Sequence, residues 1–244
     1  MKWLVTTASL VLLAACSNPL PSQQLANKTD LRVADAAMAS GLPQTALSVT
    51  RGILQSDPQN VGALLRQGDA LLAMGQLDAA RECYRRTVAV DPNSADGLRG
   101  LGRVALTMGD ARQAEAAFRK ATEVDPKNAA ALNNLGIALD LQDRHDEAQT
   151  AYHAALAQRP DMIAASVNLG LSLALAGATD SALAILRPLA SVPAADSRIR
   201  ENLAVAMALA GDESGASKVL SADMSQDKVS TALAGYVALK VSAK

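Results

Sequence analysis

Apolar and polar residues alternate along most of this chain with the spacing of an α-helix. Between positions 94 and 126, Leu98, Leu101 and Ala105 recur at steps of three and four, which places them on one face of a helix. A second apolar series with helical spacing includes Ala114 and Phe118. This stretch therefore predicts two amphipathic helices, each with one face to bury.

The boundaries of these two helices can also be read from the sequence. Ser94 carries a side-chain oxygen that can cap the first helix, and Asp110 can cap the second. Gly109, between them, suits the left-handed backbone conformation in which helices often end. Asp125-Pro126 ends the second helix, because proline cannot continue one. The stretch is predicted to fold as a helical hairpin.

The same pattern recurs every 34 residues, which predicts six hairpins at 27–60, 61–94, 95–128, 129–162, 163–196 and 197–230. Three residue types keep this period: a proline after the second helix, a glycine between the helices and an alanine in the second helix. They stand at Pro58, Pro92, Pro126 and Pro160; at Gly41, Gly75, Gly109, Gly177 and Gly211; and at Ala46, Ala80, Ala114, Ala148, Ala182 and Ala216. Asp143 replaces the fourth glycine. Because one hairpin cannot bury its apolar face alone, the copies must stack.

This pattern resembles the tetratricopeptide repeat (TPR), in which a Leu-Gly pair in the first helix is followed by an aromatic residue in the second. Leu101-Gly102 and Phe118 match it in the third copy, and Gly136 and Gly170 continue the series. These glycines are expected to let the two helices approach closely. The resemblance implies an all-α, right-handed solenoid of about six hairpins, with residues 231–244 as a cap, that binds proteins and is not an enzyme.

The first residues have the pattern of a secretion signal. Lys2 is followed by a mostly apolar run that is too short to span a membrane, so 1–15 is predicted to be a signal peptide. The run ends in Leu13-Ala14-Ala15-Cys16, which resembles the lipobox of bacterial lipoproteins. The resemblance implies acylation of Cys16, and Ser17 after it suggests sorting to the outer membrane with the body in the periplasm. Residues 16–26 are expected to form a flexible tether.

Composition narrows the possible partners and chemistry. The chain carries 23 basic and 24 acidic residues, a formal net charge of −1, which does not favour nucleic acid as a partner. His145 and His153 lie eight residues apart without a cysteine or acidic cluster, so no metal site is expected. Cys83 is interpreted as a packing residue. No cofactor, small-molecule substrate or catalytic set is predicted, and protein partners remain.

Asparagines at the same place in successive copies are the most informative polar series. Asn134, Asn168 and Asn202 lie 34 residues apart in first helices, which line the concave face in TPR proteins. Each amide offers an acceptor and two donors suited to the backbone of an extended peptide. Neighbouring residues complete the predicted groove: Asn133, Arg99 and Arg103. The alternative interpretation, in which the asparagines only stabilise neighbouring helices, stays open.

The combination of a lipobox, a tether and about six repeats also resembles the lipoproteins that assemble the tight-adherence (Flp) pilus. The late segments 167–177 and 200–211 contribute to this resemblance. It implies a role in assembling or locating the outer-membrane secretin of the pilus. A general envelope adaptor that recruits cell-wall enzymes or outer-membrane assembly partners is the alternative, and it would have the same sequence features.

Overall fold

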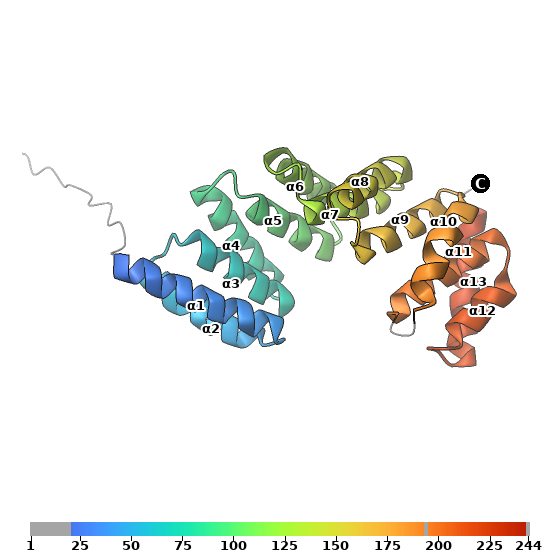
Figure 1. The fold of residues 1–244 in the computed structure, drawn as a ribbon, viewed down its shortest axis with the longest axis horizontal. Helices are drawn as coiled ribbons and strands as arrows, with labels where there is room; N and C mark the ends of the chain where they lie inside the picture. The colour runs from blue at the N-terminus through green and yellow to red at the C-terminus, as the bar shows by residue number, and fades with distance from the viewer. Residues whose placement is uncertain (1–20, 193–194, 243–244) are drawn as a thin grey trace, which may run out of the picture.

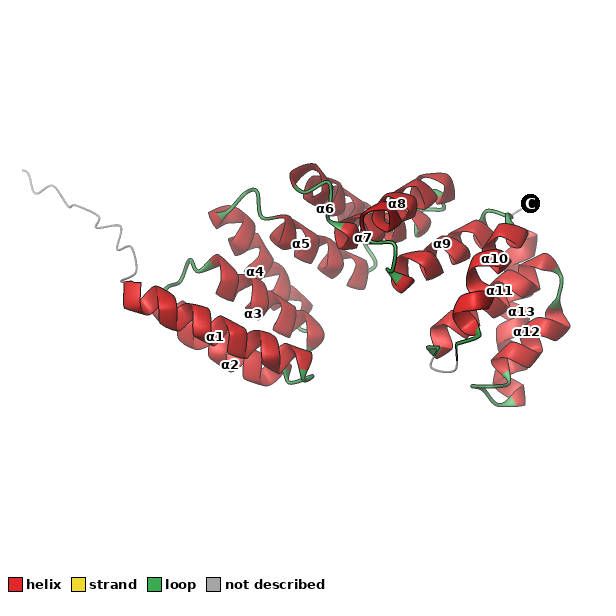
Figure 2. Cartoon of the chain, viewed as in Figure 1, coloured by secondary structure: helices red, strands yellow, loops and turns green. Residues whose placement is uncertain are grey.

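The computed structural model describes residues 21–192 and 195–242, and over these residues it contains helices and loops without strands (Figure 2). Cys16 and the predicted signal peptide lie outside the described residues. The helices are α1 (Pro21–Ala39), α2 (Pro43–Ser56), α3 (Val61–Ala73), α4 (Leu77–Val90), α5 (Ala95–Thr107), α6 (Ala111–Val124), α7 (Ala129–Asp140), α8 (His145–Gln158), α9 (Ile163–Leu175), α10 (Thr179–Ala190), α11 (Ser197–Ala210), α12 (Glu213–Leu220) and α13 (Gln226–Ser242). None of the described helices has both the length and the apolar character that crossing a membrane requires.

Each predicted copy contains one helical hairpin, and the predicted boundary residues have their expected roles. Ser94 and Asp110 accept hydrogen bonds from the backbone N–H of Gly97 and Gln113, at 3.2 and 2.9 Å. Gly109 has φ of +80°. Asp143, which replaces the glycine of the fourth copy, adopts the same left-handed region with φ of +58°. An aspartate tolerates this conformation better than most residues, so the fourth turn keeps the shape of the others.

The two ends of the array differ from the predicted boundaries. α1 begins at Pro21, so Pro21–Ala26 are helical and do not belong to an extended tether. Proline is favoured in the first turn of a helix, where its missing N–H is not needed. At the other end α12 is short, and the last helix, α13, begins at Gln226 rather than at 231. Val229, on α13, is fully buried, so this helix covers the apolar end of the array.

The hairpins stack in order, and the odd-numbered helices form the more tightly spaced layer. Each odd-numbered helix from α1 to α9 contacts the next odd-numbered helix, whereas none of the described even-numbered helices from α2 to α12 contacts another. In a curved stack the more closely spaced layer lies on the concave side. The result is an arch, with α6 and α8 along its outer edge above α5, α7 and α9 (Figure 1).

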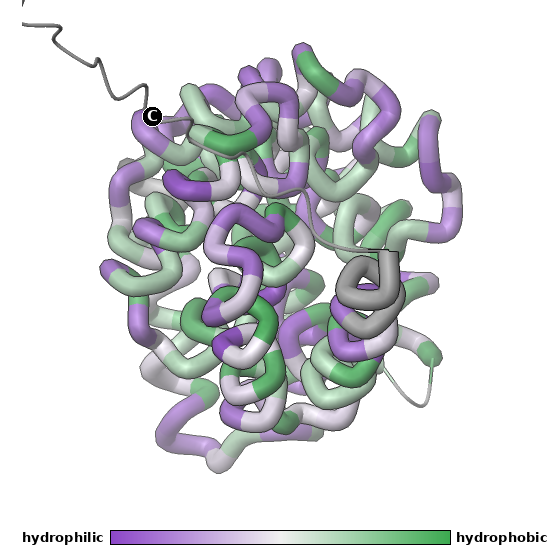
Figure 3. The backbone as a smooth tube through the Cα atoms, turned by 90° about the vertical axis from the view of Figure 1, so that its left-hand side faces the viewer, coloured by the Kyte–Doolittle hydropathy of each residue, from purple (hydrophilic) through white to green (hydrophobic). Residues whose placement is uncertain are grey.

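The core consists of a thin layer of apolar side chains between the two layers of helices. Three aromatic residues of the even-numbered helices occupy it: Tyr84, Phe118 and Tyr152, each at most 1% exposed. Hydrophobic and hydrophilic stretches alternate along the turns of the tube in Figure 3, as expected of helices with two different faces. The predicted close approach is confirmed at Gly102, where an added Cβ would lie 2.5 Å from the Phe118 ring. An added Cβ at Gly136 would likewise lie too close to the Tyr152 ring.

Candidate protein-binding surface

The solvent-accessible side of the odd-numbered helices forms the concave surface of the arch, which we call the inner face. On α7 and at the residue that follows it, the inner face includes Asn134, Ile137 and Leu141, all at least partly exposed, whereas the intervening Leu135 and Ala138 are buried. Steps of three and four between accessible residues describe one stripe along the helix. The equivalent stripe on α9 includes Asn168, Leu171 and Leu175, so neighbouring helices present corresponding residues.

The inner face divides into two halves, which we call charged and uncharged after the middle positions of its stripe. These positions are Asp35, Asp69 and Arg103 on α1, α3 and α5, but Ile137, Leu171 and Val205 on α7, α9 and α11. Ile137 and Leu171 are partly exposed, whereas Val205 is buried. The uncharged half therefore presents apolar side chains in the middle of the stripe on α7 and α9.

The charged half is largely self-neutralised. Arg103 forms an ion pair with Asp69 of the preceding repeat at 2.8 Å, and Asp69 also accepts from the Tyr84 hydroxyl. Arg99, the other predicted groove cation, pairs with Asp96 on its own helix at 2.9 Å. Each predicted arginine thus has a carboxylate partner within the chain. This half does not present the net positive strip that the arginines alone would suggest.

The amides of the uncharged half form a hydrogen-bonded chain between α7 and α9. Asn168 donates to Asn133 Oδ1 at 3.0 Å, and Asn133 donates to Asn134 Oδ1 at 3.4 Å. Asn133 is buried, with 5% exposure, whereas Asn134 and Asn168 remain partly accessible. The structure therefore brings three of the predicted amides together. The link between repeats runs through Asn133, one position away from the expected Asn134.

Asn202 lines a groove between α9 and α11 together with Asn168. The groove has a volume of about 480 Å³, and the residues around it are Ile163, Ala164, Val167, Asn168, Asp196, Arg198, Ile199, Glu201 and Asn202. Ile163 is 57% exposed at its rim. Apolar, amide and charged side chains surround this groove, and its apolar part with the two amides suits an extended segment that inserts an apolar side chain and pairs its backbone with the asparagines. Sequence reasoning placed the asparagines here but missed the apolar residues of α9.

The remaining candidate residues have structural surroundings. Cys83 is buried and donates to Gln67 Oε1 at 3.2 Å, and burial raises the pKa of its thiol. His145 Nδ1 lies 2.8 Å from Asp140 Oδ1, and His153 is exposed on α8. Among the described residues no group of three or more histidine, cysteine, aspartate or glutamate side chains is arranged to hold a metal ion.

A polar cluster outside the predicted site joins the fourth and fifth repeats at the turn between α7 and α8. Asp140 accepts from the Tyr152 hydroxyl at 2.8 Å and from the Ser172 hydroxyl of the next repeat at 2.7 Å. Its side chain is only 16% exposed, and Ser172 is fully buried. Burial, with the charge and hydrogen bond of Asp140, raises the pKa of Tyr152. The cluster fixes the fifth repeat against the fourth beside the inner face.

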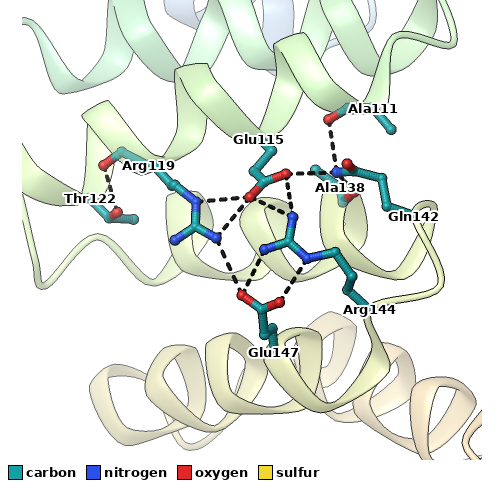
Figure 4. Close-up of polar contacts among 8 residues, drawn as sticks. All are labelled: Ala111, Glu115, Arg119, Thr122, Ala138, Gln142, Arg144 and Glu147. Atoms are coloured by element: carbon teal, nitrogen blue, oxygen red, sulfur yellow. Dashed lines mark hydrogen bonds and ion pairs between the residues drawn. The ribbon is translucent and has the colours of Figure 1, made fainter.

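The same turn contacts the third repeat through charged side chains on the outer side of the arch (Figure 4). Arg144 contacts both carboxylate oxygens of Glu115 at 2.8 Å and pairs with Glu147 at 2.7 Å. Gln142 and Arg119 also donate to Glu115, each at 2.8 Å. Burial alone would raise the pKa of Glu115, but the hydrogen bonds from Gln142, Arg119 and Arg144 outweigh it and lower this pKa to about 2.

Glu115→Gln is expected to lower the free energy of unfolding by about 1–2 kcal/mol at neutral pH, because charge-assisted hydrogen bonds between repeats are lost. The folded-state pKa lies below the ordinary value of 4.5. The contribution of Glu115 is therefore complete above that value and disappears as the pH falls towards 2. Urea unfolding of both proteins across this range measures the difference. A difference that stays constant down to pH 2 would contradict the assignment, and Glu82→Gln, in an exposed pair, is the control.

Comparison with known proteins identifies the repeats. Two family models described as tetratricopeptide repeat match residues 37–103, 99–150 and 142–198, which together exceed half of the chain. No curated protein matches the sequence.

Several solved structures share the fold. MamA is 27% identical with a TM-score of 0.54, and the match covers 63% of this chain and 90% of MamA. PilW is 22% identical with a TM-score of 0.72, covering 80% of this chain and 90% of PilW. PilF of Pseudomonas aeruginosa is 16% identical with a TM-score of 0.69, covering 81% and 90%. At these identities the likeness to PilW and PilF concerns the fold. The chain belongs to the tetratricopeptide-repeat family and is a scaffold for binding proteins, not an enzyme.

Proposed function

We propose that this scaffold binds its protein partner on the inner face of α7, α9 and α11. The observation that carries the proposal is the change along the inner face from paired charges on α1, α3 and α5 to partly exposed apolar residues and amides on α7 and α9. The groove between α9 and α11 would receive an apolar side chain of an extended partner segment, while Asn168 and Asn202 bind its backbone. At the apolar part of the groove, made by Ile163, Val167 and Ile199, the partner is expected to present an apolar side chain, because burying an unpaired charge there is unfavourable.

Replacing Asn134, Asn168 and Asn202 with alanine is expected to weaken partner capture about tenfold or more, since buried hydrogen bonds to the partner backbone are lost. Helix content should change little, because the three side chains are partly accessible. Circular dichroism and a pull-down of the partner measure the two effects. Unchanged capture would mean that the asparagines only stabilise neighbouring helices. Replacing the exposed residues Gln55, Arg112 and His153 with alanine provides a control on the even-numbered helices.

The scaffold is proposed to be anchored to the outer membrane through an acylated Cys16, with the repeats in the periplasm. The support is the sequence Leu13-Ala14-Ala15-Cys16 at the end of an apolar run. Two or three acyl chains on one residue hold a protein at a membrane far more firmly than one chain does.

Cys16→Ser is expected to leave the protein without acyl chains and to move it from the membrane fraction to the soluble fraction. Labelling with a fatty-acid analogue and fractionation of the envelope measure both effects. Cys83→Ser is the matched control, because Cys83 is buried within α4 and should not be acylated. Membrane association that survives Cys16→Ser would contradict the proposed anchor.

The process served is proposed to be assembly of a tight-adherence (Flp) pilus, in the role of TadD, by assisting the assembly or location of the secretin. The supporting features are the lipobox, the number of repeats and the segments 167–177 and 200–211. PilW, described as a widely conserved type IV pilus biogenesis factor, and PilF have the same fold over most of this chain. This likeness favours pilus assembly over a general envelope adaptor.

A crosslinked pull-down from envelope fractions, with the full-length acylated protein as bait, tests this assignment. Recovery of a secretin supports the pilus role, and its loss with the triple asparagine variant ties the interaction to the inner face. Recovery of only cell-wall enzymes would reject the pilus role and favour the envelope adaptor, while leaving the inner face as the binding surface.

A further inference from the structure

The outer side of the arch carries a second groove, between α4 and α6, which we call the outer groove. Its volume is about 350 Å³, and the residues around it are Arg81, Arg85, Val88, Leu98, Leu101, Gln113, Ala116, Ala117 and Lys120. The floor is apolar and comes from all three helices, α4, α5 and α6. The groove exists because the even-numbered helices do not contact one another on the convex side. Its size is at the lower end of the range of ligand pockets, about 300 to 1,000 Å³, and gives room for a few apolar side chains.

The rim of the outer groove is positively charged and has no acidic residue among its lining. Arg81 and Arg85 pair only with the exposed carboxylates of Asp78 and Glu82, three residues earlier on the same helix. Such exposed pairs contribute little to stability, so a new carboxylate can compete for these arginines. Lys120 forms no ion pair with any residue that the structure describes. Three cations therefore surround an apolar floor.

At the next junction along the array, between α6 and α8, side chains of this chain itself fill the corresponding crevice. In the next repeat, 34 residues later, the position of Arg81 holds Glu115 and the position of Gln113 holds Glu147. The position of Arg85 holds Arg119. Between α6 and α8 the two glutamates bind Arg119 and Arg144 and bridge the crevice (Figure 4). Between α4 and α6 the positions of the two glutamates hold Arg81 and Gln113, and Asp110, which caps α6, stands in the place of Arg144. This junction therefore lacks the two bridging glutamates, while its rim carries Arg81, Arg85 and Lys120.

We propose that the outer groove binds an acidic amphipathic segment of a second protein. Apolar side chains of that segment lie on Val88, Leu98 and Ala117, and its carboxylates pair with Arg81, Arg85 and Lys120. The outer groove and the inner face belong to opposite sides of the array, so the chain can hold two proteins at once. This site is independent of the partner proposed for the inner face.

Binding of designed helical peptides to the purified full-length protein tests the proposal. The probes share one leucine stripe and carry glutamate, glutamine or lysine at the remaining positions, and fluorescence anisotropy reports binding. The glutamate peptide is expected to bind saturably at low salt, about tenfold or more tightly than the glutamine peptide, and to weaken as salt rises. Similar binding of all three peptides, or no binding of the glutamate peptide, would overturn the proposal.

Two variants locate the binding. Arg85→Glu combined with Lys120→Glu is expected to abolish the preference for glutamate, whereas Arg51→Glu with Lys228→Glu makes the same change in net charge on exposed residues elsewhere and should preserve it. Ala116→Trp, at an exposed alanine of α6, fills the outer groove without changing the net charge. This variant should also bind the glutamate peptide more weakly. Binding to phosphatidylglycerol vesicles that needs Arg85 and Lys120, without peptide binding, would instead assign the groove to a membrane surface and reject a protein partner.

Discussion

Phe118→Ala is expected to lower the free energy of unfolding by about 3–5 kcal/mol, the range for removing a fully buried aromatic side chain. Phe118 is 0% exposed and lies between α5 and α6, so the loss leaves a cavity in the middle of the array. Urea denaturation followed by circular dichroism measures the change. Phe118→Leu, which keeps part of the volume, should lose clearly less. A loss below 1 kcal/mol for Phe118→Ala would contradict the packing described above.

The glycine opposite Phe118 gives a sharper form of this test. Gly102→Ala alone places a methyl group 2.5 Å from the Phe118 ring and should destabilise the hairpin by about 1–3 kcal/mol. In the Phe118→Ala background the same methyl group enters the cavity, and alanine also favours the helix. The double variant should therefore be more stable than the sum of the single changes, with a coupling of about 1–3 kcal/mol. Simple additivity would show that the two residues do not face each other.

Asp140→Ala is expected to lower the free energy of unfolding by about 2–4 kcal/mol. It removes the acceptor shared by the Tyr152 and Ser172 hydroxyls, and Ser172 keeps only the His145 carbonyl at 3.5 Å; a buried hydroxyl left without a partner costs about 1–3 kcal/mol. Asp140→Asn keeps one carbonyl oxygen and should lose less. Since Ser172 belongs to α9, the loss should also free the fifth repeat from the fourth, which hydrogen exchange of α9 amides measures.

The control for Asp140→Ala is Asp161→Ala, in the exposed turn between α8 and α9, which should change stability by less than about 0.5 kcal/mol. Equal effects of the two substitutions would mean that Asp140 does not join the repeats. Protection of α9 that stays unchanged in Asp140→Ala would contradict the link through Ser172.

The hairpins could be predicted from sequence because every copy carries its own boundary signals. Gly109 and Asp110 end one helix and begin the next through interactions within a few residues of each other, and the structure confirms both. The packing glycines were predictable for the same reason, since Gly102 and its aromatic partner lie in one hairpin. The start of α1 at Pro21 was missed, because a proline before an uncharged stretch is also typical of a tether.

The features that depend on the offset between repeats were not predictable from the period. Asn168 bonds with Asn133 and not with Asn134, because the residue that lies opposite on the next helix is set by the rotation between repeats. The Asp140 cluster could be recognised in the sequence, because the residues at the same position of the neighbouring copies, Leu106 and Ala174, are apolar. Comparing each copy with the next at every position would have found this cluster and the two halves of the inner face.

Site-specific photo-crosslinking tests most directly whether the inner face of α7, α9 and α11 binds the partner. A crosslinking amino acid at Leu171, on the inner stripe of α9, is compared with one at His153, which is exposed on α8. We predict that the protein with the crosslinker at Leu171 captures the partner recovered in the pull-down, and that the protein with the crosslinker at His153 does not. Capture from His153 with none from Leu171 would contradict the account.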